Sequence, residues 1–202
     1  SGHPCCTAAI GKIVNEYQYS IKDRQFGSIV AKVKADKPDA IYASGYYFTA
    51  GPLVSQLRAA GVTVPIIGQE GYDSQKFIEI AGEAAEGVII TTSLDRDSDE
   101  PETKNFIQEF EKRAGFKDDM VAASAHTAIM VAAEALKKAG TTNPKAIRNA
   151  IAKTDLKVST GRIKFNLIGE VMKAVQVQVV KEGNWHHYAV IDDPALLAPP
   201  DK

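Results

Sequence analysis

Signals for membranes, nucleic acids and secretion are scarce in this 202-residue sequence. No apolar run reaches the roughly 18 residues that a membrane-spanning helix needs. The start, SGHPCCTAAIGK, lacks the charged and apolar parts of a secretory signal, although a mature or trimmed chain would also lack them. The net charge is −1, so we expect neither nucleic acid nor an anionic membrane as the main partner.

Cysteine is also nearly absent, and the two cysteines are direct neighbours, Cys5 and Cys6. Neighbouring cysteines can form only a strained disulfide, and His3 alone does not complete a set of zinc ligands. We interpret the pair as part of a damaged or artificial N-terminus. The rest of the chain contains no cysteine, which suits an oxidising compartment without requiring one.

Motifs for catalysis, metals and cofactors are missing as well. The sequence has no nucleophile elbow, phosphate loop or dinucleotide fingerprint. The acidic stretch DRDSDEPE, which starts at Asp95, lacks the glycine-hinged pattern of a calcium loop. We interpret it as a solvated loop that leads into a helix, with Asp99 as the cap. His186 and His187 alternate along a predicted strand and so cannot both bind one ion, and His126 is a lone, packed histidine. No cofactor and no metal are expected.

A regular alternation of strands and helices occupies the first part of the chain. Periodicity and turn residues predict strands at 12–19, 39–44, 64–69 and 86–94, and helices at 23–36, 50–61, 74–82 and 100–115. This alternation is typical of a parallel sheet covered by helices, the doubly wound α/β fold. The hydrophobic content of 45% and the charged content of 24% suit a soluble globular protein.

The second part of the chain has a different pattern. Residues 120–140 form one long alanine-rich helix, and we expect it to be heavily buried because small side chains allow close packing. A shorter helix follows, with Asn143 as its cap. The segment 175–191 predicts a β-hairpin, because valine and glutamine alternate up to the turn at Glu182-Gly183-Asn184.

Large polar-tipped groups follow two of the predicted strands. Tyr46 and Tyr47 come after the strand at 39–44, and Glu70 comes after the next strand. Ligands of open parallel sheets bind beyond the carboxyl ends of the strands. A glutamate there can hold an ammonium group, and a tyrosine face adds cation–π attraction. Gly45 and Gly71 would let the backbone approach the ligand. The alternative is that the tyrosines cap the core and the glutamate is solvated.

The stretch from about Tyr17 to Pro194 resembles one known family. The matching segments are DRQFGSIVAKVKADKPDAIYASGYYFTAGPLVSQLRAAG, IIGQEG, IAGEAAEGVIITTS, PETKNFIQEFEKRAG and TGRIKFNLIGEVMKAVQVQVVKEGNW. In order and spacing they resemble the later part of the leucine/isoleucine/valine-binding proteins of branched-chain amino acid ABC transporters, which have the type I periplasmic-binding fold. The resemblance implies that Tyr46 and Glu70 hold the α-amino group of the ligand.

The resemblance also implies that part of the family's architecture is missing. Members of the family are longer and begin with a first lobe that binds the ligand carboxylate. This chain is therefore expected to be a fragment, a proteolytic product or an engineered half protein. The implied division is a second-lobe sheet domain at 12–118, helices resembling first-lobe elements at 119–156, C-terminal strands and the hairpin at 157–194, and tails at 1–11 and 195–202.

The implied function is that of a periplasmic receptor without catalytic activity. Two lobes would close on an amino acid, which an ABC permease then takes up. Phe48 and Tyr72 would suit a larger or aromatic ligand, and His126 falls near a position where the family often has an aromatic residue close to the ligand. A ligand-sensing regulator of the same fold is an alternative. A less favoured alternative is an enzyme with Glu70 as base and Tyr46 as acid.

The long alanine-rich helix raises a question about partners. Its apolar face has to be covered, because the first-lobe sheet that would cover it is absent from the sequence. We therefore expect self-association, such as a domain-swapped homodimer, or docking with the missing first lobe.

Overall fold

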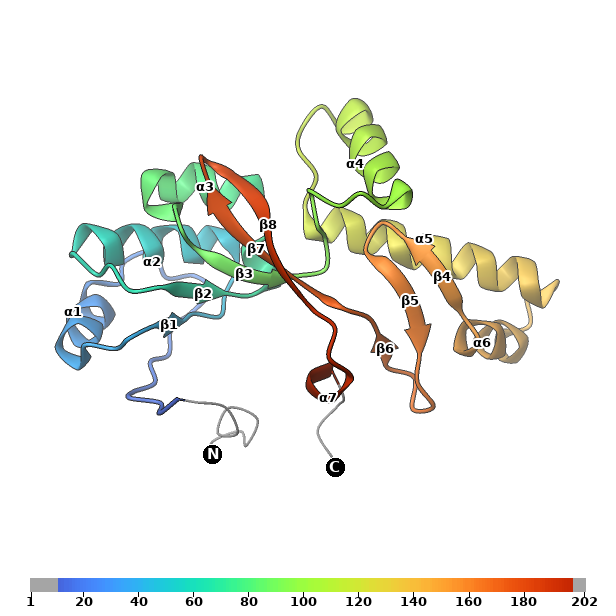
Figure 1. The fold of residues 1–202 in the computed structure, drawn as a ribbon, viewed down its shortest axis with the longest axis horizontal. Helices are drawn as coiled ribbons and strands as arrows, with labels where there is room; N and C mark the ends of the chain where they lie inside the picture. The colour runs from blue at the N-terminus through green and yellow to red at the C-terminus, as the bar shows by residue number, and fades with distance from the viewer. Residues whose placement is uncertain (1–10, 198–202) are drawn as a thin grey trace.

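The computed structural model of the chain describes residues 11–197, so Cys5 and Cys6 lie outside the described residues. Two groups of elements lie beside each other (Figure 1). The first, here called the sheet half, consists of α1 (Gly27–Asp36), β1 (Ile41–Tyr42), α2 (Tyr47–Ala59), β2 (Ile66–Gly68), η2 (Glu70–Tyr72), α3 (Gln75–Ala81), η3 (Gly82–Ala85), β3 (Ile89–Thr92), β7 (Val175–Lys181) and β8 (Asn184–Ile191).

The second group, here called the helix half, has a small sheet of its own. It consists of α4 (Pro101–Ala114), α5 (Met120–Ala139), α6 (Pro144–Ala152), β4 (Asp155–Val158), β5 (Gly161–Phe165) and β6 (Val171–Met172). A last short helix, α7 (Pro194–Leu197), follows β8. The chain crosses from one half to the other after β3, through residues 93–100, and returns between β6 and β7 (Figure 1). We call residues 93–100 the connector.

The main sheet has the strand order β1-β2-β3-β7-β8. Its first three strands are parallel, with Ile41 opposite Ile66 and Ile67 opposite Ile89. The hairpin β7–β8 forms as predicted, and it joins this sheet antiparallel to β3. The α/β fold with helices flanking a sheet is therefore confirmed, and the sheet is mixed.

The predicted strand at 12–19 is wrong, because this segment forms no β-structure. Its contacts come from side chains: the hydroxyl of Tyr17 donates to Asp36, and that of Tyr19 donates to the carbonyl of Ser44. Ile13 is 55% exposed. An alternating pattern defines two faces, but a strand also needs a neighbouring edge with which to pair. The parallel part of the sheet thus has three strands instead of the predicted four.

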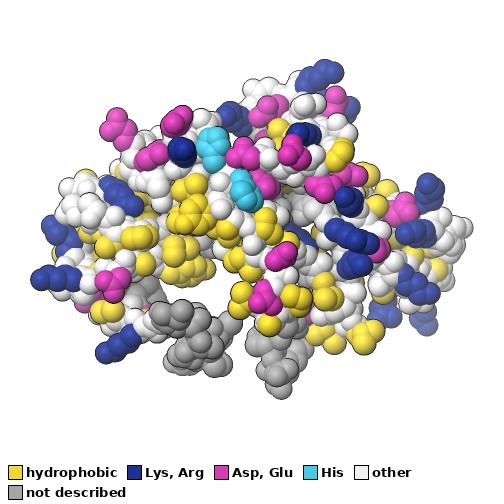
Figure 2. Space-filling model, viewed as in Figure 1, with side chains coloured by type: hydrophobic (Ala, Val, Ile, Leu, Met, Phe, Trp, Pro, Cys, Tyr) yellow, Lys and Arg dark blue, Asp and Glu magenta, His cyan; other side chains and the backbone are white. Residues whose placement is uncertain are grey.

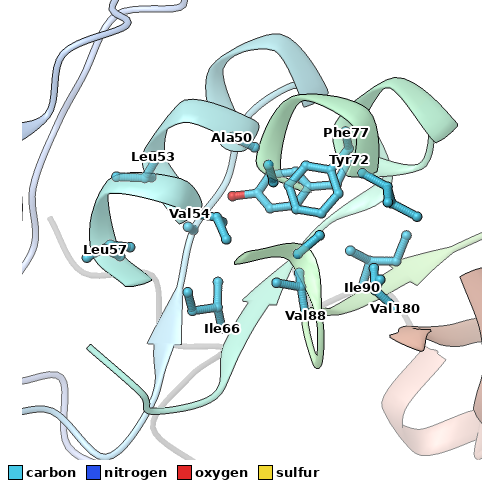
Figure 3. Packing of buried hydrophobic residues seen from close by; sticks show 14 of the residues in the cluster. Ala50, Leu53, Val54, Leu57, Ile66, Tyr72, Phe77, Val88, Ile90 and Val180 are labelled. Atoms are coloured by element: carbon cyan, nitrogen blue, oxygen red, sulfur yellow. The ribbon is translucent and has the colours of Figure 1, made fainter. Parts of the chain in front are cut away.

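The main core lies between the sheet and the helices α1–α3 (Figure 3). Its largest fully buried side chains include Tyr72, Phe77, Ile66 and Ile90. Each such side chain stabilises the fold by roughly 1.5–3 kcal/mol relative to its exposed state. The rings of Tyr72 and Phe77 stack with centroids 5.0 Å apart, and Phe77 stacks on Trp185 at 5.7 Å. One continuous cluster therefore unites η2 and the start of β8 with α3.

The helix half is packed more sparsely. The buried residues of α5 are Ala123, Val131 and Ala135, whereas Ile129 is 69% exposed. The expectation that this helix is heavily buried is therefore wrong within the described residues. The reason is geometric: α6 and β4 pack against α5, and Phe106 of α4 packs on Ala123, but the side of α5 that carries Val121 and Ile129 stays exposed. Among residues 11–197, no helix combines the length and apolar character needed to cross a bilayer.

Two predicted helix caps have different outcomes. Asn143 caps α6 by accepting from the backbone amides of Lys145 and Ala146 at 3.0 and 3.2 Å. Asp99 does not cap α4, which starts after Glu100. Asp99 instead forms an exposed ion pair with Lys104, at 2.7 Å.

Candidate functional site

The loops that follow β1 and β2 touch each other at one edge of the main sheet. The side-chain amide of Gln69 donates to the carbonyl of Gly45 at 2.7 Å. A Cβ atom on Gly71 would lie 2.3 Å from the same carbonyl oxygen. Gly71 therefore makes room for the neighbouring loop, whereas the sequence had predicted that it makes room for a ligand. Because β1 and β2 are parallel neighbours, the loops carrying Tyr46 and Glu70 share this rim.

Three aromatic side chains surround the start of α2. Tyr46 is the residue before the helix and is 53% exposed. Its ring stacks on that of Phe48, with centroids 5.6 Å apart and planes 7° from parallel. The guanidinium of Arg24 lies 5.2 Å from the centre of the Phe48 ring. Tyr47 packs against the core cluster instead. Tyr46 therefore presents aromatic surface to solvent, whereas Tyr47 faces the core and meets the ring of Phe48 edge-on, with centroids 5.2 Å apart.

Glu70 is the first residue of η2 and is half-buried. Its Oε1 accepts a hydrogen bond from the hydroxyl of Ser93, at 2.5 Å. Lys173, in the return crossing between β6 and β7, is close enough to interact: burial lowers the pKa of its ammonium, and the charge of Glu70 opposes that shift. Sequence reasoning missed both residues. Ser93 could have been found, because it lies at the carboxyl end of the predicted strand 86–94, at the same sheet edge.

Tyr72 does not belong to the rim. Its side chain is fully buried between the helices and the sheet (Figure 3). It packs on the backbone of β2, where a Cβ on Gly68 would lie 2.5 Å from the tyrosine ring. This placement corrects the expectation that Tyr72 borders a ligand. Burial, and to a lesser degree the neighbouring Tyr19, raise the pKa of the Tyr72 hydroxyl well above its usual range.

A buried charge cluster lies next to the rim. Arg96 of the connector pairs with Asp73 at 2.7 Å and with Asp118 at 3.5 Å. The hydroxyl of Thr92 also donates to Asp73. Burial raises the pKa of both carboxyl groups, and the charge of Arg96 opposes that effect. The sequence predicted a solvated loop here, and that prediction is wrong for Arg96, which is 15% exposed.

The two neighbouring histidines contact the connector. Nδ1 of His187 lies 2.9 Å from Asp95, and Nδ1 of His186 lies 3.2 Å from Asp97. Asp97 also accepts from the backbone amide of His187, at 2.8 Å. Histidine and acidic side chains lie side by side on this face, where the two halves meet (Figure 2). Within the described part of the chain, no group of three or more potential metal ligands occurs.

His126 is packed, as predicted. The centre of its ring lies 5.0 Å from the centre of the Phe106 ring, and its Nδ1 lies 3.0 Å from the hydroxyl of Ser159. This pair does not form a reactive serine site, because Ser159 is 1% exposed and donates to the carbonyl of Ala123. A hollow of about 670 Å³ lies nearby between α4, α5 and β4, in the other half from Tyr46 and Glu70.

The chain matches a family model described as "Periplasmic binding protein" over residues 5–184. A leucine-, isoleucine-, valine-, threonine- and alanine-binding protein of Pseudomonas aeruginosa is 27% identical over 149 residues, which cover 74% of this chain and 40% of that protein. The Leu/Ile/Val-binding protein of Escherichia coli K12 is 36% identical over 69 residues, covering 34% of this chain and 19% of that protein.

Solved structures agree with these sequence matches. A leucine-binding protein of Thermotoga maritima superposes with a TM-score of 0.79 and 31% identity, covering 86% of this chain and 50% of that one. A branched-chain amino acid substrate-binding protein of Streptococcus pneumoniae, in complex with isoleucine, shares the fold with a TM-score of 0.76. The two chains are 24% identical, and the match covers 86% of this chain and 49% of that one.

These relatives are all longer than the present sequence. The chain spans about 40% of the length of the first curated relative and about half of the solved structures. The matched family model covers most of the chain, which agrees with the resemblance inferred from the sequence. The chain belongs to the periplasmic binding protein family, and within it is similar to the leucine/isoleucine/valine-binding proteins.

Proposed function

We propose that the chain is part of an extracytoplasmic solute-binding protein that binds an amino acid for uptake by an ABC permease. The observation that carries this proposal is the shared rim of β1 and β2, where Tyr46 faces solvent and the carboxylate of Glu70 is held by Ser93. The curated relatives are named for binding leucine, isoleucine and valine. In this proposal the protein works in the periplasm and is not an enzyme.

In the proposed binding mode, Glu70 accepts hydrogen bonds from the ligand ammonium. The hydrogen bond from Ser93 orients the carboxylate before the ligand arrives, which lowers the entropic cost of binding. The ring of Tyr46 adds cation–π attraction. The ligand carboxylate would be bound by the other lobe, and closure of the two lobes would remove both charged ends from water.

The proposed contact set is smaller than the one expected from sequence. Tyr46, Glu70 and Phe48 remain candidates for direct contact, while Tyr47 and Gly71 shape the rim from within. Phe48 already stacks on Tyr46, so the two rings form one aromatic wall. This wall favours a ligand with an apolar or aromatic side chain.

A ligand-sensing regulator is the second candidate, since the same rim would serve it equally well. The environment of Glu70 argues against an enzyme in which it acts as general base. A serine hydroxyl already donates to its carboxylate and a lysine lies nearby, so the carboxylate is engaged by groups of the protein itself.

The open face of α5 leads to a further expectation about assembly. Val121, Ile129 and Leu136 lie on one side of the helix and are 65%, 69% and 43% exposed, and an apolar face of this kind is usually covered. We propose that the chain self-associates or docks with a first lobe through this face. Light scattering over a range of protein concentrations tests self-association, and a constant monomer mass would contradict that part of the proposal and leave docking with a first lobe as the remaining alternative.

Affinity is expected to be low for the isolated monomer. With one lobe, Glu70 stays partly solvated and its ion pair contributes roughly 0–1 kcal/mol. The ligand also loses several kcal/mol of translational and rotational freedom on binding. The dissociation constant should therefore exceed about 1 mM. Calorimetry with leucine, isoleucine, valine and phenylalanine should show no tighter binding, and micromolar binding by a monomer would contradict this estimate.

Weak binding at the rim can still be observed by NMR. Leucine at tens of millimolar should shift the backbone amides of Tyr46 and Glu70 in the wild-type chain. The same titration should leave these amides unchanged in Glu70→Gln, because a neutral amide cannot pair with the ammonium. Glu79→Gln is the matched control, because Glu79 is exposed and pairs only with Lys76 of its own helix. Equal shifts in Glu70→Gln and the wild type would overturn the proposed role of the rim.

A further inference from the structure

One guanidinium connects three separate segments of the molecule beside the rim. Nη2 of Arg96 lies 2.7 Å from Asp73 Oδ1 and donates to the carbonyl of Asp118 at 3.1 Å. Its Nε lies 3.5 Å from Asp118 Oδ2. Its Nη1 donates to the side-chain oxygen of Gln178 at 3.2 Å. Asp73 directly follows η2, Asp118 lies just before α5 in the helix half, and Gln178 lies in β7.

All three partners are shielded from water. Asp73 is 3% exposed, Asp118 is 2% exposed and Gln178 is fully buried. A buried carboxylate is costly unless a cation and hydrogen bonds compensate it. Arg96 is the shared cation for two carboxylates, and their charges outweigh the effect of burial and raise its pKa. Loss of Arg96 would leave both carboxylates buried without a counter-charge.

The same connector holds the ligand-binding turn at both ends. Ser93 binds Glu70, the first residue of η2, and Arg96 binds Asp73, the residue that follows η2. Within the turn, the amide of Asp73 donates to the carbonyl of Glu70 at 3.1 Å. The turn and the start of the connector are therefore bonded into one unit. The connector therefore contacts this turn at both of its ends.

We propose that Arg96 is a positioning residue, which fixes the turn that carries Glu70 to the chain crossing and so makes ligand affinity depend on the arrangement of the two halves. The last part of this inference rests on the proposed function of the rim. The first part, the fixing of the turn, does not depend on any ligand. Arg96 is not proposed to touch the ligand.

Amide hydrogen exchange measures the fixing of the turn directly. The amides of Tyr72, Asp73 and Ser74 are hydrogen-bonded within the turn, so their exchange reports its opening. In Arg96→Gln they should exchange about tenfold faster or more, relative to core amides of α2 such as that of Leu57. Arg96→Lys keeps the charge and should restore protection in part, although a lysine cannot reproduce the forked contacts.

Arg113→Gln is the matched control, since Arg113 is 80% exposed and pairs with Glu109 along one helix. This variant should leave the hydrogen-exchange rates of the turn amides unchanged. A merely stabilising role for Arg96 would accelerate turn and core amides by the same factor, and that result would overturn the proposal. The fluorescence of Trp185, the only tryptophan, verifies folding, because its indole donates to the carbonyl of Ser74 at 3.4 Å.

The pH profile provides a second readout. Without Arg96, the folded-state pKa values of Asp73 and Asp118 should rise further, with Asp119 and Glu111 as additional acidic neighbours. An acid whose folded pKa is raised stabilises the fold at low pH and loses that contribution as pH rises. The loss of thermal stability in Arg96→Gln should thus be larger at pH 8 than at pH 5. An equal loss at both values would contradict the charge-based account.

The leucine titration separates the two levels of the proposal. If leucine shifts the rim amides in the wild type, Arg96→Gln should weaken these shifts, while Arg113→Gln should not. Unchanged leucine shifts in Arg96→Gln would overturn the link between Arg96 and affinity. If leucine, isoleucine, valine and phenylalanine shift no rim amide in the wild type, the proposed function fails and the affinity link fails with it. The exchange experiment still decides whether Arg96 fixes the turn.

Discussion

The sheet half and the helix half differ in how completely each buries its apolar side chains. In the sheet half, Tyr72, Phe77 and Ile66 are fully buried within one continuous cluster. In the helix half, the buried residues form two small groups, while Ile129 remains 69% exposed. The comparison teaches that the sheet half has a core of its own, whereas the helix half leaves several apolar side chains of α5 exposed.

The largest expected effect comes from removing a core ring in the sheet half. Phe77→Ala should lower the free energy of unfolding by about 3–5 kcal/mol, because it leaves a cavity between Tyr72 and Trp185. Ile129→Ala is the matched change in the helix half and should stay within about 0.5 kcal/mol. Urea unfolding followed by Trp185 fluorescence measures both. Similar losses in the two variants would remove the contrast between the halves.

A second prediction concerns the contact between the two rim loops. Gly71→Ala should destabilise the sheet half by about 1–3 kcal/mol, because the new methyl group would meet the carbonyl of Gly45. Gly27→Ala is the control, since nothing lies within 4 Å of its added Cβ. In a helix it should be neutral or stabilising by up to about 1 kcal/mol. Thermal unfolding compares the two, and a neutral Gly71→Ala would show that the loops are not in close contact.

A smaller effect is expected where the connector joins β8. His187→Ala should cost about 0.5–1.5 kcal/mol, because Asp95 is 15% exposed and its Oδ2 would lose the contact with His187, while its Oδ1 would keep the amide of Asp97 at 3.0 Å and Gln178 at 3.4 Å. His186→Ala should cost less, since both His186 and Asp97 are more than 40% exposed. Urea unfolding at pH 7 tests this order. The reverse order would show that exposure does not govern these two pairs.

The smallest effect is expected on the surface of the helix half. Arg162 and Lys164 hold the pKa of Asp155 at about 2, below its usual range. A depressed folded pKa adds stability above the unfolded pKa and loses it as pH falls through the folded value. The melting temperature of Asp155→Asn should therefore lie slightly below that of the wild type at pH 7. The difference should shrink between about pH 4 and pH 2, and a constant difference would contradict the assignment.

Much of the local structure was predictable because it depends on neighbouring residues. Helical periodicity and caps such as Asn143 located the helices of both halves. The alternation around Val177 predicted the hairpin, and apolar runs predicted β1, β2 and β3. The positions of Tyr46 and Glu70 after two of these strands identified the candidate rim, because parallel neighbours end at the same edge.

Other features depended on contacts between distant segments. The sequence could not tell that Tyr72 turns into the core, because a tyrosine next to a glutamate suits a rim equally well. It also placed Arg96 in a solvated acidic loop, although its partners lie 23 residues before it, 22 after it and 82 after it in the chain. Such partners become visible only when the strands are assembled.

The sequence by itself determined the α/β class, the approximate positions of the helices and the family, since each is encoded in short patterns of size, polarity and turn residues. The tertiary structure decided which of these patterns face inward, where the hairpin joins the sheet and how the connector is held. Burial and buried charge pairing are the reason. Both depend on which surfaces remain accessible to water, and only the assembled chain sets that accessibility.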